Sequence, residues 1–384
     1  MTQPVFSRRR LLGAAFGMCA AGLGLPGPAR GTTGLSLVDI AGREVRLARP
    51  PRRIALGDGP LAYVAALLRP QAPFDDIVAW GDNFRAADLG GYRAYQARFP
   101  MMDGIPLLRG AGAGAIDAEH LLDLAPDVLL LNLSSLAGAR ASGLIAHLAQ
   151  AGIAVVFVDF RQHIMANTAR SVQIMGEVFS AQARAQDFLA FRDQALAQVA
   201  DRLSGAVRRP RVVIERAAGL YQDCCLTYGT GNFGELVGLA GGENLAAGLL
   251  PGTFGTLHPE QVIAADPEVV IVTGADWSLY APAGDWVGLG PGTDPARARD
   301  RLAQLMRRPA YRRLDAVREG RVHAIWHPFY DNPYSFVAVQ RLARWLHPQA
   351  LADVDPEQTL RELHERFLPI PYQPAYWVSL EAVV

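Results

Sequence analysis

Two glutamates occupy equivalent places in two similar stretches of the chain. Glu119 lies in IDAEHLLDLAPDVLLL, residues 116–131, and Glu260 lies in LHPEQVIAADPEVVIV, residues 257–272. Each stretch runs from a polar start through a helix-like segment to a proline, an acidic residue and an apolar run. A carboxylate there can accept paired hydrogen bonds from an arginine of a partner, or it can complement the dipole of its own helix. The dipole does not explain why both copies share the glutamate, so we expect a docking role.

Cys224 and Cys225 are the only cysteines beyond the first 34 residues. Neighbouring Cα atoms lie about 3.8 Å apart, closer than the usual disulfide span of about 4.4–6.8 Å. A bond between them would be strained and readily reduced, and two partly buried free thiols are the alternative. A thiol enzyme using this pair, or a hydrolase using His327 with Asp331, would be a function of a different class. No Cys-x-x-Cys motif, nucleophile elbow or metal-ligand spacing supports catalysis, so we expect no enzyme.

Aromatic, basic and sulfur-containing side chains follow several predicted strands. Ligands of open α/β sheets bind at the carboxyl ends of the strands, so we expect ligand contacts from these residues. They are Trp80, Arg109, Tyr221, Cys224, Cys225, Trp277, His327 and Tyr330. Aromatic walls with one or two arginines suit a bulky anionic ligand. Core packing, an ion pair, structural hydroxyls or a turn would explain the same residues without a ligand.

Two glycine-rich loops raise the question of nucleotide binding. They are RGAGAGA at 109–115 and YGTGNFG at 228–234. Neither ends in the Gly-Lys-Ser/Thr of a phosphate-binding loop, and neither is a dinucleotide fingerprint. We expect the first to be a loop at the edge of a cleft and the second to let the backbone approach a ligand.

The elements that must position these residues alternate between strand and helix in two blocks. Residues 35–56 predict a hairpin and a strand. Up to about residue 160, strands such as VLLLN and AVVFVDF are nearly all apolar, as in a parallel sheet covered on both faces. Residues 167–205 then carry a helical pattern without proline, enough for one helix of roughly 50 Å at about 1.5 Å per residue. The alternation resumes at PRVVIER.

We therefore predict an α/β protein with two pseudo-symmetric α/β lobes, mostly parallel sheets and one long inter-lobe α-helix. The predicted segments are an export signal at 1–34, an N-terminal lobe at 35–166, the inter-lobe helix at 167–205 and a C-terminal lobe at 206–384. The repeated glutamate unit then occurs once in each lobe. A chain of 384 residues, half of them apolar, is long enough for two such lobes.

Residues 1–34 differ from the rest of the chain. Arg8, Arg9 and Arg10 precede an Ala/Gly/Leu run that is too short and too rich in glycine for a good membrane span. The string SRRRLL resembles a twin-arginine export signal, and an ordinary secretory signal is the alternative. The residues before Cys19 match a lipobox poorly. We expect the signal to be cleaved and the mature protein to be soluble in the periplasm.

The charge of the mature chain bears on its partners. Residues 1–34 hold four of the 37 basic residues and none of the 37 acidic ones, so the remainder has a net charge of about −4. That balance argues against nucleic acid as a partner, because phosphate binding needs a basic face. Lysine is absent, so cationic ligand contacts must come from arginine or a charged histidine.

Together these features resemble the helical-backbone class of periplasmic substrate-binding proteins, which serve ABC importers of iron–siderophores, haem and cobalamin. The resemblance extends from DIAGREVRLARPPRRIALG to LARWLHP and includes the paired glutamate units, the inter-lobe helix and GELVGLAGGENL. It implies ligand binding between the lobes and docking of Glu119 and Glu260 onto arginines of a permease dimer. It also implies a monomer with no permanently bound cofactor, carrying a ferric siderophore-type chelate.

Other ligands of the same class remain alternatives. Haem receptors of this class typically offer a tyrosine near the glycine loop, where this chain has only Arg, Gly and Ala. A bare zinc or manganese receptor needs several His and carboxylate ligands from both lobes, and the eight histidines here are scattered. Cobalamin stays open.

Overall fold

The computed structural model describes residues 34–111, 116–205, 208–221, 224–250 and 252–382. Residues Gly34–Val384 form one compact unit. The export signal predicted at 1–34 lies outside the described residues except for Gly34, and so does part of the loop at 109–115. Within the described part of the chain, none of the helices has the length and apolar character that crossing a membrane requires.

The N-terminal lobe contains a hairpin and a parallel sheet. The predicted hairpin is confirmed, with β1 (Leu35–Val38) antiparallel to β2 (Glu44–Leu47). The parallel sheet has the order β4-β3-β5-β6. Its strands are β3 (Ile54–Leu56), β4 (Ile77–Trp80), β5 (Val128–Asn132) and β6 (Ala154–Val158). Every residue of β5 is buried, which explains the apolar run that precedes Asn132.

The C-terminal lobe contains the second sheet, with a parallel centre and antiparallel edges. Its order is β10-β8-β7-β11-β12-β13, and β9 also pairs with β7. The strands are β7 (Arg211–Glu215), β8 (Leu226–Tyr228), β9 (Glu243–Asn244), β10 (Phe254–Thr256), β11 (Val269–Gly274), β12 (Val322–Trp326) and β13 (Trp377–Ser379). Strands β7, β11 and β12 are parallel, whereas β8, β10 and β13 run antiparallel to their neighbours. The prediction of two α/β lobes with mostly parallel sheets is confirmed.

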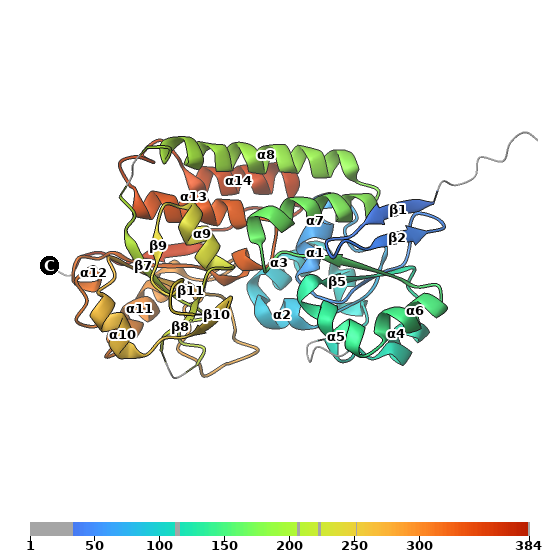
Figure 1. Cartoon of the computed structure of the whole chain (residues 1–384), viewed down its shortest axis with the longest axis horizontal. Coiled ribbons are helices and arrows are strands. Elements are labelled where there is room, and N and C mark those ends of the chain that lie inside the picture. The colour runs from blue at the N-terminus through green and yellow to red at the C-terminus, as the bar shows by residue number, and fades with distance from the viewer. Residues whose placement is uncertain (1–33, 112–115, 206–207, 222–223, 251, 383–384) are drawn as a thin grey trace, which may run out of the picture. The chain divides into compact units, whose positions relative to one another are not determined.

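Helices cover the two sheets (Figure 1). Those of the N-terminal lobe are α1 (Leu61–Leu68), α2 (Asn83–Ala87), α3 (Leu89–Arg98), α4 (Ala118–Leu124), α5 (Leu136–Ala141) and α6 (Leu144–Gln150). Those of the C-terminal lobe are α9 (Phe233–Leu239), α10 (Pro259–Ala265), α11 (Pro295–Leu305), α12 (Asp315–Arg318), α13 (Ser335–Leu346) and α14 (Pro356–Phe367). Short 3₁₀ helices are η1 (Pro100–Gly104), η3 (Leu133–Ser135) and η4 (His327–Tyr330).

The connection between the lobes differs from the single helix predicted over 167–205. It consists of two helices, α7 (Ile164–Val178) and α8 (Gln182–Arg202). Ser180 lies between them with a φ of 53°, a left-handed conformation that ends a helix. The two helices run antiparallel, because Arg192 of α8 donates to the carbonyl of Met165 at the start of α7 at 2.8 Å.

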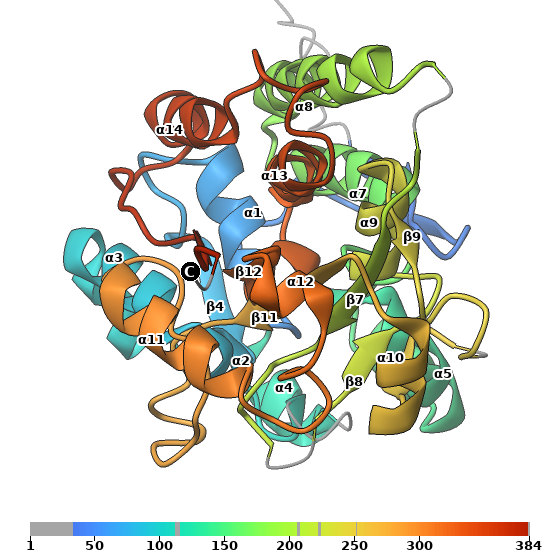
Figure 2. The same ribbon diagram turned by 90° about the vertical axis from the view of Figure 1, so that its left-hand side faces the viewer.

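Helix α8 contacts both lobes, and so does α7, whose first residue, Ile164, donates through its amide to Glu235 of α9 at 2.9 Å. Near the start of α8, Arg184 donates through Nε to the carbonyl of Leu67, the penultimate residue of α1, at 2.6 Å. Near its end, Gln340 of α13 donates to the carbonyl of Ala195 at 3.1 Å. Figures 1 and 2 show α13 and α14 beside α8. At about 1.5 Å per residue the 21 residues of α8 span roughly 30 Å, so a helix of ordinary length is long enough to reach both lobes.

The lobes also share a buried aromatic cluster. The ring of Tyr63 in α1 packs edge-on against Trp326 of β12 and Tyr334 of the C-terminal lobe, with centroids 5.9 and 5.8 Å apart. The Tyr63 hydroxyl donates to the buried carboxylate of Asp88. Burial raises the pKa of Asp88 to about 6, although its hydrogen bonds oppose that rise. Continuous packing of this kind restricts rotation of one lobe against the other.

The paired units are confirmed as the same local structure. Helices α4 and α10 both have seven residues, and each ends at a left-handed residue, Ala125 or Asp266, with a φ of 42°. A buried proline and an acidic residue follow, and then strand β5 or β11 begins. The proline cannot continue the helix, so both units end their helix at the same place.

Candidate functional site

The side chains with unusual environments gather at the carboxyl ends of the parallel strands. Asp58 follows β3, Arg161 follows β6, and Arg216 follows β7. Trp277 follows β11, and the segment from His327 to Asp331 follows β12. This is the edge at which open α/β sheets bind ligands, and contacts at this edge link the two lobes.

Arg161 makes the most extensive ionic contact between the lobes. Its Nε donates to Asp331 Oδ1 at 2.7 Å, and its terminal nitrogen also pairs with the same carboxylate. The second partner is Asp58, at 2.9 Å. Burial disfavours the charge of Arg161, yet the two carboxylates raise its pKa well above the ordinary value. For Asp331 burial is the larger effect and raises the pKa to about 7, although Arg161 opposes that rise.

Three predicted ligand residues come together in the C-terminal lobe. The ring of His327 lies 5.3 Å from that of Trp277 and 4.7 Å from that of Tyr330, measured between centroids. His327 Nδ1 is 2.8 Å from the Thr273 hydroxyl and 3.4 Å from that of Tyr228. Burial, followed by the charges of nearby arginines, lowers the pKa of His327 to about 3. The imidazole is therefore neutral at physiological pH.

Arg216 brings positive charge to the same group of residues. Its guanidinium carbon lies 4.7 Å from the centre of the Phe254 ring, within the range of a cation–π contact. Its charge contributes to lowering the pKa of His327 and opposes the burial-driven rise in the pKa of Tyr330. Arg216 is half-buried and forms no ion pair with any acidic side chain among the described residues. A planar cation is thus available beside aromatic rings.

Cys224 and Cys225 form a disulfide with a Cα–Cα distance of 3.7 Å. The structure thereby decides between the two alternatives that the sequence left open. Cys225 is only 1% exposed, and Cys224 is half-buried. Tyr221, four residues before Cys225, is 50% exposed, and burial followed by the neighbouring Tyr280 raises its pKa. Tyr221 is therefore an exposed aromatic side chain that lies close to the disulfide in the sequence.

Trp80 and Arg109 lie apart from the His327 group. Trp80 is 2% exposed and packs edge-on against Phe74, Phe84 and Tyr92. Its indole borders a pocket of about 280 Å³ beside the end of β4. Arg109 is exposed and pairs through Nε with Asp117 Oδ2 at 3.3 Å. Asp117 caps α4 by accepting from the His120 amide, so Arg109 lies next to the helix that carries Glu119.

Glu119 and Glu260 occupy equivalent, exposed positions. Each is the second residue of its helix, α4 or α10. The caps differ, because Asp117 caps α4 whereas His258 and Gln261 form a reciprocal capping box on α10. Neither glutamate forms an ion pair with any residue that the structure describes. Both carboxylates therefore face solvent at a helix start, available to an external cation.

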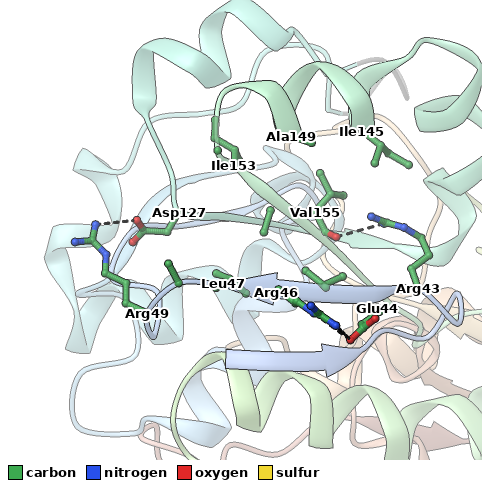
Figure 3. A pocket seen from close by; sticks show the side chains of 14 residues that line it. Arg43, Glu44, Arg46, Leu47, Arg49, Asp127, Ile145, Ala149, Ile153 and Val155 are labelled. Carbon is green, nitrogen blue, oxygen red and sulfur yellow. Dashed lines mark hydrogen bonds and ion pairs between the residues drawn. The ribbon is translucent and has the colours of Figure 1, made fainter. Parts of the chain in front are cut away.

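A separate cavity lies beside the hairpin of the N-terminal lobe (Figure 3). It has a volume of about 440 Å³ and is lined by β2, α6 and β6, including Arg43, Arg46, Ile145 and Val155. Asp127, which also lines it, directly precedes β5. This cavity therefore opens at the amino end of the strands, on the opposite edge of the sheet from Arg161.

Sequence reasoning missed four residues of the site. Arg161, Arg216 and Phe254 are not among the contacts expected from the sequence, and Asp331 appears there only beside His327 in the hydrolase alternative. The signal for Arg216 was present, because an arginine directly follows the strand VVIE. Among the described residues, no group of three or more His, Cys, Asp or Glu side chains could hold a metal ion.

Comparisons with known proteins agree on one family. The family model described as "Periplasmic binding protein" matches residues 90–326, well over half of the chain. No curated protein matches the chain by sequence.

Solved structures share the fold at low sequence identity. The TroA-like periplasmic binding protein FepB from Veillonella parvula has a TM-score of 0.81 and 22% identity, covering 90% of this chain and 99% of that one. The molybdate-binding protein MolA from Haemophilus influenzae, solved with molybdate, has a TM-score of 0.67 and 19% identity, covering 88% and 99%. A periplasmic heme-binding protein from Pseudomonas aeruginosa has a TM-score of 0.53 and 16% identity, covering 87% and 99%. The family match and the shared fold place this chain in the periplasmic binding protein family, as a substrate-binding protein of the ABC importer type.

Proposed function

We propose that this protein captures a ferric siderophore-type chelate at the carboxyl ends of its two sheets and delivers it to an ABC permease. The proposal rests above all on Arg216. This half-buried guanidinium stacks on Phe254, lies near Tyr330 and has no described acidic partner. A cation in such surroundings favours an anion that can also stack on aromatic rings. Ferric catecholates combine both properties.

Arg161 has a different role in this proposal. Its charge is already balanced by Asp58 and Asp331, so it contributes less to anion binding than Arg216. Its contacts instead hold the loops after β3, β6 and β12 together. A ligand would then contact half-buried Tyr330, whose ring packs against buried His327, with Tyr221 at the exposed edge.

Delivery is assigned to Glu119 and Glu260. One exposed carboxylate on each lobe, at equivalent positions of equivalent helices, suits a permease dimer that offers the same arginine twice. This assignment extends the resemblance of the paired units to a specific contact. The twin-arginine route of export through residues 1–34 remains a prediction.

A thermal-shift screen of the mature protein tests the ligand. Candidates are a ferric tris-catecholate, a ferric hydroxamate, haem, cobalamin, molybdate and free Zn²⁺. A ligand at one hundred times its Kd adds about 2.7 kcal/mol of stability, so the melting temperature should rise clearly with the anionic ferric chelate. If the melting temperature rises only with haem, cobalamin, molybdate or Zn²⁺, that compound and not the ferric chelate is the ligand.

A matched pair of variants tests the residue that carries the proposal. Arg216→Gln should weaken binding of the ferric tris-catecholate at least tenfold, because it removes the cation but keeps a polar side chain. Arg312→Gln changes an exposed arginine of the same lobe and should leave the Kd unchanged. If the two variants bind the ferric tris-catecholate with equal affinity, Arg216 does not belong to the binding site.

A further inference from the structure

The disulfide between Cys224 and Cys225 fixes the start of a strand. Cys225 directly precedes β8 and has a φ of 81°, which a residue other than glycine rarely adopts. Such a backbone persists only where its surroundings hold it, and the covalent bond to the preceding residue is one constraint that does so. The sulfur of Cys225 is buried and accepts a hydrogen bond from the Tyr311 hydroxyl at 3.9 Å.

The carbonyls of Cys225 and Leu226 accept hydrogen bonds from two different parts of the lobe. The carbonyl of Cys225 accepts from the amide of Leu257 at 3.0 Å, and that of Leu226 accepts from the amide of Arg216 at 2.7 Å. Leu257 directly follows β10, whereas Arg216 directly follows β7. The backbone of Cys225 therefore sets the position of β10 relative to Arg216.

Strand β10 joins the two functional regions of the C-terminal lobe. Its first residue, Phe254, contacts Arg216, and its chain continues through Leu257 into α10, which carries Glu260. Within the sheet β10 pairs only with β8, in the register Phe254↔Tyr228 and Thr256↔Leu226. A three-residue edge strand has few hydrogen bonds of its own, so its alignment depends on β8.

We propose that the Cys224–Cys225 disulfide positions β10, and thereby makes the geometry of both Phe254 and Glu260 depend on oxidised cysteines. The functional consequence rests on the proposed function, whereas the positioning of β10 can be measured without ligand or permease. Reduction would allow the backbone of Cys225 to leave its left-handed conformation and would weaken the hydrogen bond from Leu257. The contact of Phe254 with Arg216 and the position of Glu260 would then loosen together.

The redox step requires a dithiol reductant. One of its thiolates attacks the sulfur of Cys224, the more exposed of the pair, and displaces the thiolate of Cys225, which takes up a proton. The second thiol of the reductant then releases Cys224 as a thiol. Two electrons and two protons pass to the cysteines, and the reductant becomes a disulfide.

Hydrogen exchange on three forms of the protein tests this positioning. Wild type is compared, with and without dithiothreitol, to Cys224→Ser/Cys225→Ser and to Cys224→Ser/Cys225→Gly. Glycine adopts positive φ without strain, so the Gly variant restores the backbone without the bond. We expect the peptide covering 252–260 to exchange at least tenfold faster in reduced wild type and in the Ser/Ser variant, and near the oxidised rate in the Ser/Gly variant. The peptide covering β11 should remain unchanged in all forms.

Three results would overturn the proposal. Unchanged exchange over 252–260 after reduction would show that the bond does not position β10. Equal exchange of the Ser/Ser and Ser/Gly variants would show that the conformation of Cys225 is not the cause. Faster exchange throughout the lobe, with a lowered melting temperature, would indicate general destabilisation. If β10 loosens as expected but affinity for the ferric tris-catecholate does not change, the proposed ligand site fails while the positioning of β10 stands.

Discussion

Arg53 and Arg211 perform the same task in the two lobes. Arg53 donates to two carbonyls at the end of α4 at 2.9 and 2.8 Å. Arg211 donates to two carbonyls at the end of α10 at 2.8 and 3.0 Å. A helix end leaves such carbonyls without partners and favours positive charge. The paired units thus share their supporting arginine as well as their exposed glutamate, although each arginine precedes the carbonyls that it contacts by more than 50 residues.

Removing either arginine should weaken its helix end. Arg53→Met and Arg211→Met each keep the aliphatic stem but lose two hydrogen bonds, so we expect each to lower the free energy of unfolding by about 1 kcal/mol. The two sites share no partner, so the free energy of unfolding of the double variant should fall by close to the sum of the two single losses. Urea unfolding measures these changes. Arg46→Met is the control, because Arg46 is exposed and pairs only with exposed Glu44, and a loss as large as that of Arg53→Met would contradict the prediction.

The Arg161 contacts predict a variant whose effect depends on pH. Arg161→Met leaves the buried carboxylates of Asp58 and Asp331 facing each other without their cation. Breaking a buried ion pair in this way should cost about 2–4 kcal/mol at pH 8. Because burial raises the pKa of Asp331 to about 7, that carboxyl is neutral at pH 5 and the loss there should be smaller. Urea unfolding at both pH values provides the measurement.

A second variant separates this effect from lost packing. Arg161→Met/Asp331→Asn removes one of the stranded carboxylates, so it should recover part of the stability at pH 8. A double variant that is no more stable than Arg161→Met would mean that the aliphatic contacts of Arg161, and not its charge, are important.

Buried His327 should make the protein sensitive to acid. Its pKa is lowered to about 3 in the folded state, whereas an unfolded histidine titrates near 6.5. The unfolded chain therefore binds the proton first as the pH falls, and folding loses stability between about pH 6.5 and 3. From pH 6.5 to 4 the loss is on the order of 3 kcal/mol, at 1.36 kcal/mol per unit of pKa.

His327→Gln provides the matching comparison. At pH 7 the variant should be less stable than wild type, because it loses the 2.8 Å contact with Thr273. The difference in Tm should narrow as the pH falls to 4, since glutamine carries no titrating group. A difference that stays constant from pH 7 to 4 would show that His327 does not titrate in this range. His323 and His364, also buried with lowered pKa values, act equally in both proteins and cancel in the difference.

Local patterns were sufficient to predict most of the fold. Apolar runs identified β5 and β6 because both faces of these strands are covered, and the Pro-acid pairs marked the ends of α4 and α10. The break at Ser180 could not be predicted, because FSAQARA contains no glycine or proline and its alanines and glutamine favour helix. The left-handed turn there results from the packing of α8 back onto α7, where Gly176 leaves room for Ala185.

The site was harder to predict because its contacts join distant parts of the chain. Arg161 and Asp331 are 170 residues apart, and a single sequence contains no signal that pairs them. His327, Trp277 and Tyr330 could be singled out from the sequence because aromatic and histidine side chains at strand ends are a local feature. Trp80 has the same local feature, yet its neighbours are other core aromatics. Position at a strand end therefore indicates at which edge of the sheet a side chain lies but not which other side chains surround it.

The exposed glutamates provide the clearest test of delivery. Glu119→Gln and Glu260→Gln keep the helical side chain but lose the charge that an arginine of the permease would pair with. We expect wild-type ligand affinity and a lower rate of uptake in vesicles containing the permease, with a larger loss in the double variant. Glu44→Gln, an exposed hairpin glutamate, is the control and should transport normally. If the carboxylates serve only the helix dipole, each variant will instead lower the free energy of unfolding by about 0.3–1 kcal/mol and leave uptake unchanged, which would exclude docking through these residues.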